Sequence, residues 1–365
     1  MHIAVVGGSL AGAYLGYQLG SNGHAVSIFD PRAPWEKPCG GGIYVDALRR
    51  YPALRQACTW NYPARWRWIS SHGERSSSTK GQSAIASRAE LNRGLLDLAL
   101  QHATVHLIPE QVRDIVRDSR GWQVQTDSPT PVAADVVIGA DGVNSVVRRK
   151  LVGRIPREHL GVTLGYWVTN GPVDEMIVQT YRDLLGYAWY FPRRDHANVG
   201  IGTRAIGADV PDLWRRLDAF LQAQCPQARK TGKWGAGIPA ASDGAFWQTP
   251  CAGPNWALVG DAAGHVHTLL GEGMSYALDD ARLVAQAIAG GDLSAYDRAW
   301  RRENGSWLRY SSEALGFVLK SGDTTDYERV AALAQGGSTL LAKLYAQAAA
   351  GFRQFARRPA RAKGV

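Results

Sequence analysis

The chain opens with two short apolar runs that flank a helical pattern. Residues 2–6 and 25–29 are apolar runs of strand length, and the helical pattern between them continues through Leu19. A turn at residues 20–23 precedes the second run. We therefore predict a β-α-β unit, which is the order of elements that opens a dinucleotide-binding fold.

The later pattern alternates between buried strands and helices. Residues 134–140 and 256–259 form apolar runs, and an amphipathic helical pattern then extends to Ala289. Between them, β-like runs at 161–168, 176–181, 187–191 and 198–203 precede a helical stretch at 212–224. We predict an antiparallel sheet with a covering helix in this middle region, and mostly helices after residue 293.

A glycine-rich turn joins the first strand to the first helix. Gly7 permits a tight turn, Gly12 lets the helix lie close to the strand, and Ser9 replaces the usual middle glycine. The helix N-terminus offers amide groups and a positive dipole end to a pyrophosphate. Asp30, 18 residues after Gly12, is placed to accept hydrogen bonds from a ribose hydroxyl. The predicted binding residues here are Gly7, Ser9, Leu10, Ala11, Gly12 and Asp30.

Two further segments favour FAD as the dinucleotide. One strand runs into Asp141-Gly142, and another ends in Gly260-Asp261 before Gly271-Glu272-Gly273-Met274 and a long helix. An aspartate at a strand end can hold ribityl hydroxyls, and the amides of a helix N-terminus suit an electron-rich flavin ring.

With these three motifs in this order, the sequence resembles FAD-dependent oxidoreductases of the glutathione-reductase-like fold with the aromatic hydroxylase topology. The resemblance implies that Arg88 contacts the FAD diphosphate or ribityl region and that Val112 lies on the strand beside adenine. It also implies FAD contacts for Asp141, Asp261, Gly271, Gly273 and Met274. The expected fold is α/β: a discontinuous Rossmann-like FAD-binding domain (1–155 and 250–290, with a small insertion near 60–85), an antiparallel substrate domain (156–249), a helical C-terminal region (291–352) and a basic tail (353–365).

Two stretches point to a subfamily. Residues 37–43 read Lys-Pro-Cys-Gly-Gly-Gly-Ile, and residues 187–192 read Tyr-Ala-Trp-Tyr-Phe-Pro. Together with the Gly-Asp and Gly-Glu-Gly segments, they resemble the geranylgeranyl reductase family. Thr268 departs from this pattern where proline is usual, and Leu270 departs where threonine is common. Flavin-dependent halogenases and monooxygenases share a related aromatic strand motif.

The candidate catalytic residues come from the same two stretches. Three consecutive glycines, including Gly41, let the backbone approach a flat ring and place Cys39 near the flavin. Strand alternation sends Tyr187, Trp189 and Phe191 to one face, where they line an apolar pocket or wall the isoalloxazine. The structural alternatives are core packing of the sheet and a small buried cysteine. His265 and His267 are candidate proton donors, with a hydrogen-bonded structural role as the alternative.

The leading functional hypothesis is a reductase that transfers hydride from reduced flavin to a C=C bond of an apolar substrate. The alternative is a monooxygenase that uses a flavin C4a-peroxide to hydroxylate an aromatic or indole substrate, including a tryptophan of a partner protein. A non-enzymatic flavin-binding scaffold is a third possibility. No second GxGxxG motif is present, so NAD(P)H would dock transiently, or a separate reductase or ferredoxin would supply electrons. No metal-ligand spacing and no hydrolase triad is visible.

Composition adds limits on class and compartment. The 365 residues are 45% hydrophobic and 20% charged, which excludes disordered, collagen-like and coiled-coil chains. No apolar run reaches the length of a membrane span, and Met1 leads into a strand without a signal peptide. The four cysteines are far apart without a CxxC pair, so we expect reduced thiols and a cytoplasmic location.

The net charge of +9 is concentrated at the C-terminus. Residues 353–365 carry five cationic side chains and no acidic one, which leaves 36 cations against 32 anions elsewhere. We read this segment as a solvated tail. Without a nucleic-acid-binding motif, the charge favours an anionic substrate, an acidic partner protein or peripheral contact with a membrane over nucleic acid. Nothing in the sequence indicates an oligomeric state.

Overall fold

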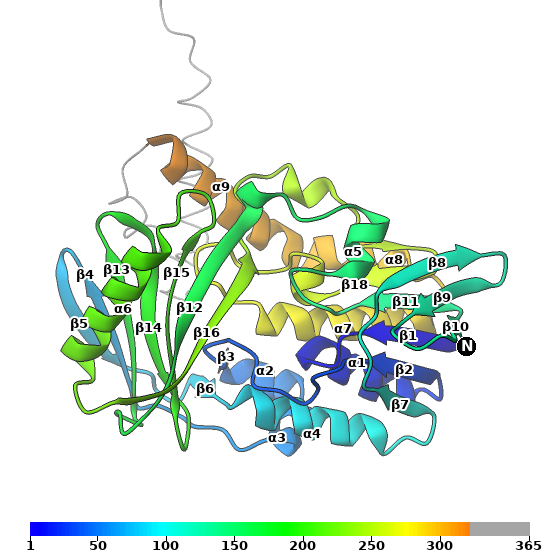
Figure 1. Cartoon of the computed structure of the whole chain (residues 1–365), viewed down its shortest axis with the longest axis horizontal. Helices are drawn as coiled ribbons and strands as arrows, with labels where there is room; N and C mark the ends of the chain where they lie inside the picture. Colours follow the sequence, from blue (N-terminus) through cyan, green and yellow to red (C-terminus); the bar gives the residue numbers. More distant parts are fainter. Residues whose placement is uncertain (322–365) are drawn as a thin grey trace, which may run out of the picture.

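The computed structural model describes residues 1–321, and within that range two large sheets lie side by side (Figure 1). The first sheet has the order β17-β18-β11-β1-β2-β7 and is parallel except for the edge strand β17. The helix α1 (Leu10–Ser21) connects its central strands β1 and β2. The strands of this sheet are β1 (His2–Val6), β2 (Ala25–Phe29), β7 (Val105–Ile108), β11 (Val136–Gly139), β17 (Ala252–Gly253) and β18 (Trp256–Leu258). The bounds of β1 and β2 are those predicted from the apolar runs, and β11 and β18 lie within the predicted runs at 134–140 and 256–259.

Helices and small strands complete this half of the molecule. The helix α1 packs against α4 (Arg88–Leu100) and α7 (Met274–Ala289), and their buried side chains join the core of the parallel sheet. A small antiparallel sheet and a two-stranded pairing flank it. The remaining elements are α2 (Val45–Arg50), α3 (Ala53–Ala57), α5 (Val146–Leu151), β3 (Gly42–Tyr44), β6 (Ser83–Ile85), β8 (Asp114–Asp118), β9 (Gly121–Gln125) and β10 (Val132–Ala134).

The second sheet has the order β16-β12-β15-β14-β13-β4-β5. Its strands are β12 (Leu160–Thr169), β13 (Glu175–Tyr181), β14 (Leu184–Pro192), β15 (Ala197–Arg204), β16 (Arg229–Pro239), β4 (Arg65–Ser70) and β5 (Gly73–Ser78). The strand β4 pairs parallel with β13, although the other pairings are antiparallel. The segment expected as a small insertion near residues 60–85 therefore extends the sheet of the middle region.

The two faces of this second sheet differ in their cover. The helix α6 (Val210–Gln224) buries Leu213, Leu217 and Phe220 against one face, close to the predicted helical stretch at 212–224. The other face carries Trp189 and Trp234, which belong to a separate apolar cluster. Residues directly opposite one another in antiparallel pairs point to the same face. The register places Trp189, Gly200, Gly165 and Trp234 in one row across this second face.

Glycines make room for the tryptophans on that face. A Cβ atom at Gly200 would lie 2.3 Å from the Trp189 ring, and one at Gly165 would lie 2.2 Å from the Trp234 ring. The two rings have centroids 6.0 Å apart. The central strands therefore present bare backbone on which the indoles lie, instead of a second layer of side chains.

The C-terminal part of the described chain is helical. It comprises α8 (Ala295–Trp300), a π-helical turn η4 (Arg301–Gly305) and α9 (Ser306–Ser321), with short 3-10 turns η1 (Arg157–His159), η2 (Phe246–Gln248) and η3 (Gly260–Ala262) earlier. The rest of the predicted helical region and the basic tail lie outside the described residues. Among residues 1–321, no helix has both the length and the apolar character that crossing a bilayer requires.

Candidate active site

The turn after β1 has the tight geometry predicted from its glycines. Gly7 adopts a φ of +107°, and a Cβ atom there would lie 2.3 Å from the Ala140 carbonyl oxygen. A Cβ atom at Gly12 would lie 1.8 Å from the Gly7 carbonyl oxygen. Any other residue at either position would push the helix away from the strand.

A buried arginine lies beside the N-terminus of α1. The Arg88 side chain is buried, and its Nη2 donates to Ser9 Oγ over 3.0 Å. Within residues 1–321 the Ser9 side chain caps no helix amide, and Arg88 has no acidic partner. Ser9, the departure from the usual glycine, thus holds the guanidinium beside the helix end. A helix N-terminus and an uncompensated guanidinium together fit a diphosphate.

Two aspartates at strand ends face the same space. Asp30 accepts hydrogen bonds from the amides of Gly8 and Arg32, each over 2.9 Å. Asp141 Oδ2 accepts from the Val146 amide, whereas Oδ1 is buried without a partner in the described part of the chain. Burial raises the pKa of Asp141. An orphaned buried acceptor in this position fits a ligand that donates a hydrogen bond.

The third aspartate is paired across the cavity. Lys37 Nζ lies 2.8 Å from Asp261 Oδ2. Burial opposes ionisation of Asp261, but Lys37 outweighs that effect and holds the pKa of Asp261 below its usual value. The pair connects the loop before the three glycines with the turn after β18.

The loop with three glycines packs closely on an aromatic ring of the second sheet. Gly41 has a φ of +76°, and a Cβ atom there would lie 2.3 Å from the Ala86 carbonyl oxygen. A Cβ atom at Gly40 would lie 2.5 Å from the Phe191 ring. The ring that this loop approaches in the structure is that of Phe191, and its approach to the flavin ring stays a prediction. Cys39 precedes these glycines, and its Sγ accepts from the Gly41 amide over 3.4 Å.

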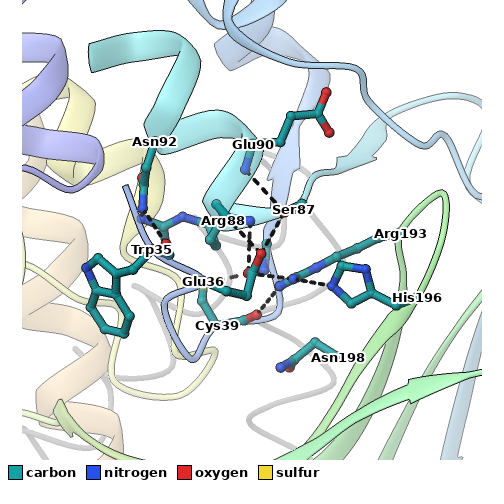
Figure 2. A network of polar contacts seen from close by, with 12 residues as sticks. Trp35, Glu36, Cys39, Ser87, Arg88, Glu90, Asn92, Arg193, His196 and Asn198 are labelled. Carbon is teal, nitrogen blue, oxygen red and sulfur yellow. Dashed lines mark hydrogen bonds and ion pairs between the residues drawn. The ribbon is translucent and has the colours of Figure 1, made fainter. Parts of the chain in front are cut away.

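A buried ion pair joins this loop to the second sheet, as Figure 2 shows. Arg193 follows β14 and is 1% exposed. Its Nη1 lies 2.5 Å from Glu36 Oε1, and its Nη2 donates to the Cys39 carbonyl over 2.8 Å. Its guanidinium also lies over the Trp167 ring at 4.9 Å.

Glu36 is also held by the N-terminus of α4. It accepts hydrogen bonds from Ser87 Oγ over 2.6 Å and from the amides of Arg88 and Ala89, both over 3.0 Å (Figure 2). Burial opposes ionisation of Glu36, but Arg193 and these donors outweigh it and lower the pKa of Glu36. Three segments that are distant in sequence therefore meet at one carboxylate.

One cavity of about 700 Å³ connects these features. It extends from the turn after β1 to the tryptophan-bearing face of the second sheet. All the predicted site residues line it except Gly12, whose contribution is the close packing of α1. Those lining it are Gly7, Ser9, Leu10, Ala11, Asp30, Cys39, Gly41, Arg88, Val112, Asp141, Tyr187, Trp189, Phe191, Asp261, Gly271, Gly273 and Met274.

The aromatic residues of β14 form one wall of the cavity. Tyr187 donates to the Leu270 carbonyl and lies beside Gly271, whereas Phe191 lies against Gly40. Trp189 stands between them on the same face. It is 8% exposed and packs in an apolar cluster, so it both lines the cavity and belongs to the core.

The sequence was compared with protein-family models and with known proteins. No family model matches the sequence. The menaquinone reductase of Mycolicibacterium smegmatis is 27% identical over 326 residues, which cover 82% of this chain and 78% of that protein. Digeranylgeranylglycerophospholipid reductase 1 of Methanopyrus kandleri is 27% identical over 331 residues, which cover 82% and 86%. Over most of its length the chain is therefore similar in sequence to curated reductases of menaquinone and of digeranylgeranylglycerophospholipid.

Solved structures agree on the fold of this flavoprotein. A geranylgeranyl bacteriochlorophyll reductase-like protein from Thermoplasma acidophilum matches with a TM-score of 0.74 and 20% identity, over 86% of both chains. A variant of the flavin-dependent brominase Bmp2 matches with a TM-score of 0.72 and 17% identity, over 98% of this chain and 99% of that one. The α/β fold class and the resemblance drawn from the motifs are confirmed.

The structure corrects one placement and resolves two alternatives. Val112 lies in the loop between β7 and β8, not on a strand, although it still lines the cavity. His265 contacts Asp280 over 2.8 Å and does not line the cavity described for residues 1–321. His267 does not line it either, and burial lowers the pKa of His267 to about 4. The positions of both histidines therefore fit the structural alternative better than the role of proton donor.

Other residues of the site were not singled out from the sequence. Trp66 and Trp234 line the cavity from β4 and β16. The alternating Arg-Trp-Arg-Trp run at 65–68 could have indicated that Trp66 lies on one face of a strand. Glu272, inside the Gly-Glu-Gly segment, also lines it, and burial raises the pKa of Glu272. The departure at Thr268 has a local reason, because its amide donates to Ser311 Oγ over 3.3 Å and proline has no amide hydrogen.

Proposed function

We propose that this flavoprotein reduces a C=C bond of an apolar, isoprenoid-like substrate. The observation that carries the proposal is the single cavity, which joins the predicted FAD cradle to an apolar face with several tryptophans. The reductase names of the homologues support the same direction. The substrate class is our inference.

The residues present fit FAD. Arg88 and the N-terminus of α1 would hold the diphosphate, Asp30 the adenosine ribose, and Asp141 and Asp261 the remaining polar groups. When bound and reduced, FAD supplies a hydride to the substrate.

The protein orients the substrate and excludes water. Tyr187 lies beside Gly271 and Phe191 lies against Gly40, so Trp189 faces the space between the two glycine-rich backbone segments. An alkene held against Trp189 would be surrounded by apolar surface on the sheet side. Glu272 lines the same cavity, and its raised pKa lets it keep a proton to a higher pH than an exposed glutamate does. We assign Glu272 as the proton source for the second alkene carbon.

Electrons would come from NAD(P)H that docks transiently, or from a separate reductase or ferredoxin. The deciding experiment is anaerobic: the flavin is reduced photochemically, and a prenyl alkene is added. Reoxidation of the flavin together with formation of the saturated product supports the proposal. A flavin that stays reduced with every prenyl alkene tested, while the enzyme is folded and loaded, refutes it.

A second candidate function is hydroxylation of an aromatic or indole substrate. Two observations support this second candidate. The fold is similar to that of the flavin-dependent brominase over nearly the whole chain, and aromatic side chains form one wall of the cavity. Turnover under ¹⁸O₂ separates the two functions. A monooxygenase places the label in the product, whereas a reductase forms an unlabelled, saturated product.

A further inference from the structure

The cavity face of the second sheet carries one feature that the proposed reaction does not use. Arg204 ends β15 and lines the cavity beside the apolar residues of the neighbouring strands. Its register partner on β12 is Gly161, and the register partner of Gly161 on β16 is Ile238. Both of these residues line the cavity as well.

The charge of Arg204 is not neutralised by any acidic side chain among residues 1–321. Two other partly buried arginines have acidic partners: Arg67 pairs with Glu175, and Arg216 pairs with Asp212 and Asp183. The buried Arg148, outside the cavity, donates instead to the carbonyls of Ala262 and Ala263. Arg204 has no carboxylate within ion-pair distance in the described range, and its Nη2 reaches only the Glu158 carbonyl over 3.4 Å. Burial lowers the pKa of Arg204, since no acid opposes that effect.

Two other cavity-lining arginines have no acidic partner among residues 1–321. Arg32 is exposed and lies over the Trp35 ring, whereas Arg88 is buried and hydrogen-bonded to neutral groups. Arg88 lies in the cradle expected to hold the FAD diphosphate. Arg204 instead ends a strand of the sheet that bears Trp189. Arg204 is partly buried, and its Nε is buried without a hydrogen-bond partner in the described range. Such a donor fits a ligand that supplies an acceptor and the opposite charge.

We propose that Arg204 binds the anionic end, a phosphate or carboxylate, of an otherwise apolar substrate. This inference rests on the proposed function and specifies its substrate class. Trp189 is in register with Gly200, four residues before Arg204 on β15, so the strand rise separates the two rows by about 13 Å. A prenyl chain with a terminal anion would span from Arg204 to the aromatic wall.

The test is calorimetric titration of the oxidised, FAD-loaded enzyme with farnesyl phosphate, farnesoic acid and farnesol. These ligands share one prenyl chain and differ in the head group. The wild type is expected to bind at least one anion about tenfold or more tightly than the alcohol, because a charge-assisted hydrogen bond is lost in the alcohol complex. The preferred anion then identifies the head group.

Arg204→Gln should reduce the affinity for that anion to the level of the alcohol and leave FAD content unchanged. Arg215→Gln is the matched control, because Arg215 lies on α6 with its side chain 74% exposed, and it should bind as the wild type does. Equal affinity of the wild type for all three ligands, no binding at all, or loss of FAD in Arg204→Gln would each overturn the assignment.

Binding and turnover are separate readouts. Selective binding of the anion without reduction of its alkene would support the Arg204 site and refute the reductase proposal. If the enzyme reduces farnesol and both anions but binds all three with equal affinity, the reductase proposal is supported and the Arg204 site is refuted.

Discussion

The ion pair between Arg193 and Glu36 provides the most specific prediction about stability. Arg193→Met would leave Glu36 charged with only neutral hydrogen-bond donors. Breaking a buried pair by removing one partner costs about 3–5 kcal/mol. Because the Glu36 side chain is 24% exposed and keeps its bonds to Ser87, Arg88 and Ala89, we expect a loss near the lower end, about 3 kcal/mol.

The reverse substitution should cost more. In Glu36→Gln the guanidinium of Arg193, which is 1% exposed, would be left without its carboxylate, so we expect about 4 kcal/mol. The double variant removes both charges. Its loss should be smaller than the sum of the single losses by about 1–3 kcal/mol, as for directly contacting residues.

The pH dependence has a defined sign. The folded-state pKa of Glu36 is lowered, so its stabilising effect is present above the unfolded carboxyl pKa and is lost as the pH falls through the folded value. In Arg193→Met the attraction that lowers this pKa is gone. The variant's deficit in unfolding free energy should therefore shrink as the pH is lowered from 7 toward 4.5.

Urea unfolding of the FAD-loaded protein, followed by far-ultraviolet circular dichroism at both pH values, measures these quantities. Arg194→Met is the matched control, because Arg194 is adjacent in sequence but exposed. If Arg193→Met and Arg194→Met differ by less than about 1 kcal/mol at pH 7, the energetic role assigned to the pair is wrong. A deficit that grows on acidification would contradict the sign of the argument.

Three other substitutions test the site. Asp30→Ala should weaken FAD binding about tenfold, because a buried acceptor for a ribose hydroxyl is lost; flavin fluorescence titration measures this, and an unchanged affinity would disprove the role. Trp189→Ala should retain FAD but lower turnover, measured with folded, loaded enzyme; a variant that fails to fold would show that packing is its main role. Glu272→Gln should slow turnover and abolish the decline in rate that we expect as pH rises through the raised pKa of Glu272; a pH–rate profile identical to the wild type excludes Glu272 as the proton source.

Local features of the fold were predictable because their causes are local. The bounds of β1 and β2 follow from apolar runs that end at glycine and at Asp30. The turn at Gly7 and the approach at Gly12 require glycine for steric reasons that hold wherever a helix follows a strand this closely. Such short-range constraints leave a visible pattern in the sequence.

Long-range pairings left no comparable pattern. The parallel pairing of β4 with β13 brings Trp66 opposite Met176, although more than a hundred residues separate them. Glu36 and Arg193 are likewise 157 positions apart. A lone glutamate before a loop and a lone arginine after a strand look like surface residues until the topology brings them together. Val112 was placed on a strand by the family resemblance alone, whereas β7 ends at Ile108, before the sequence Pro-Glu-Gln at 109–111.

The glycines of the second sheet show how such non-local causes shape the site. Gly200 and Gly165 are followed by ordinary strand residues, and in sequence they suggest only weak strands. In the fold they lie beneath Trp189 and Trp234, whose rings would collide with any side chain at those positions. Because bare backbone fixes where the indoles lie, the shape of the apolar wall depends on strand register. A substitution at either glycine would therefore alter the cavity without changing any residue that is predicted to bind FAD.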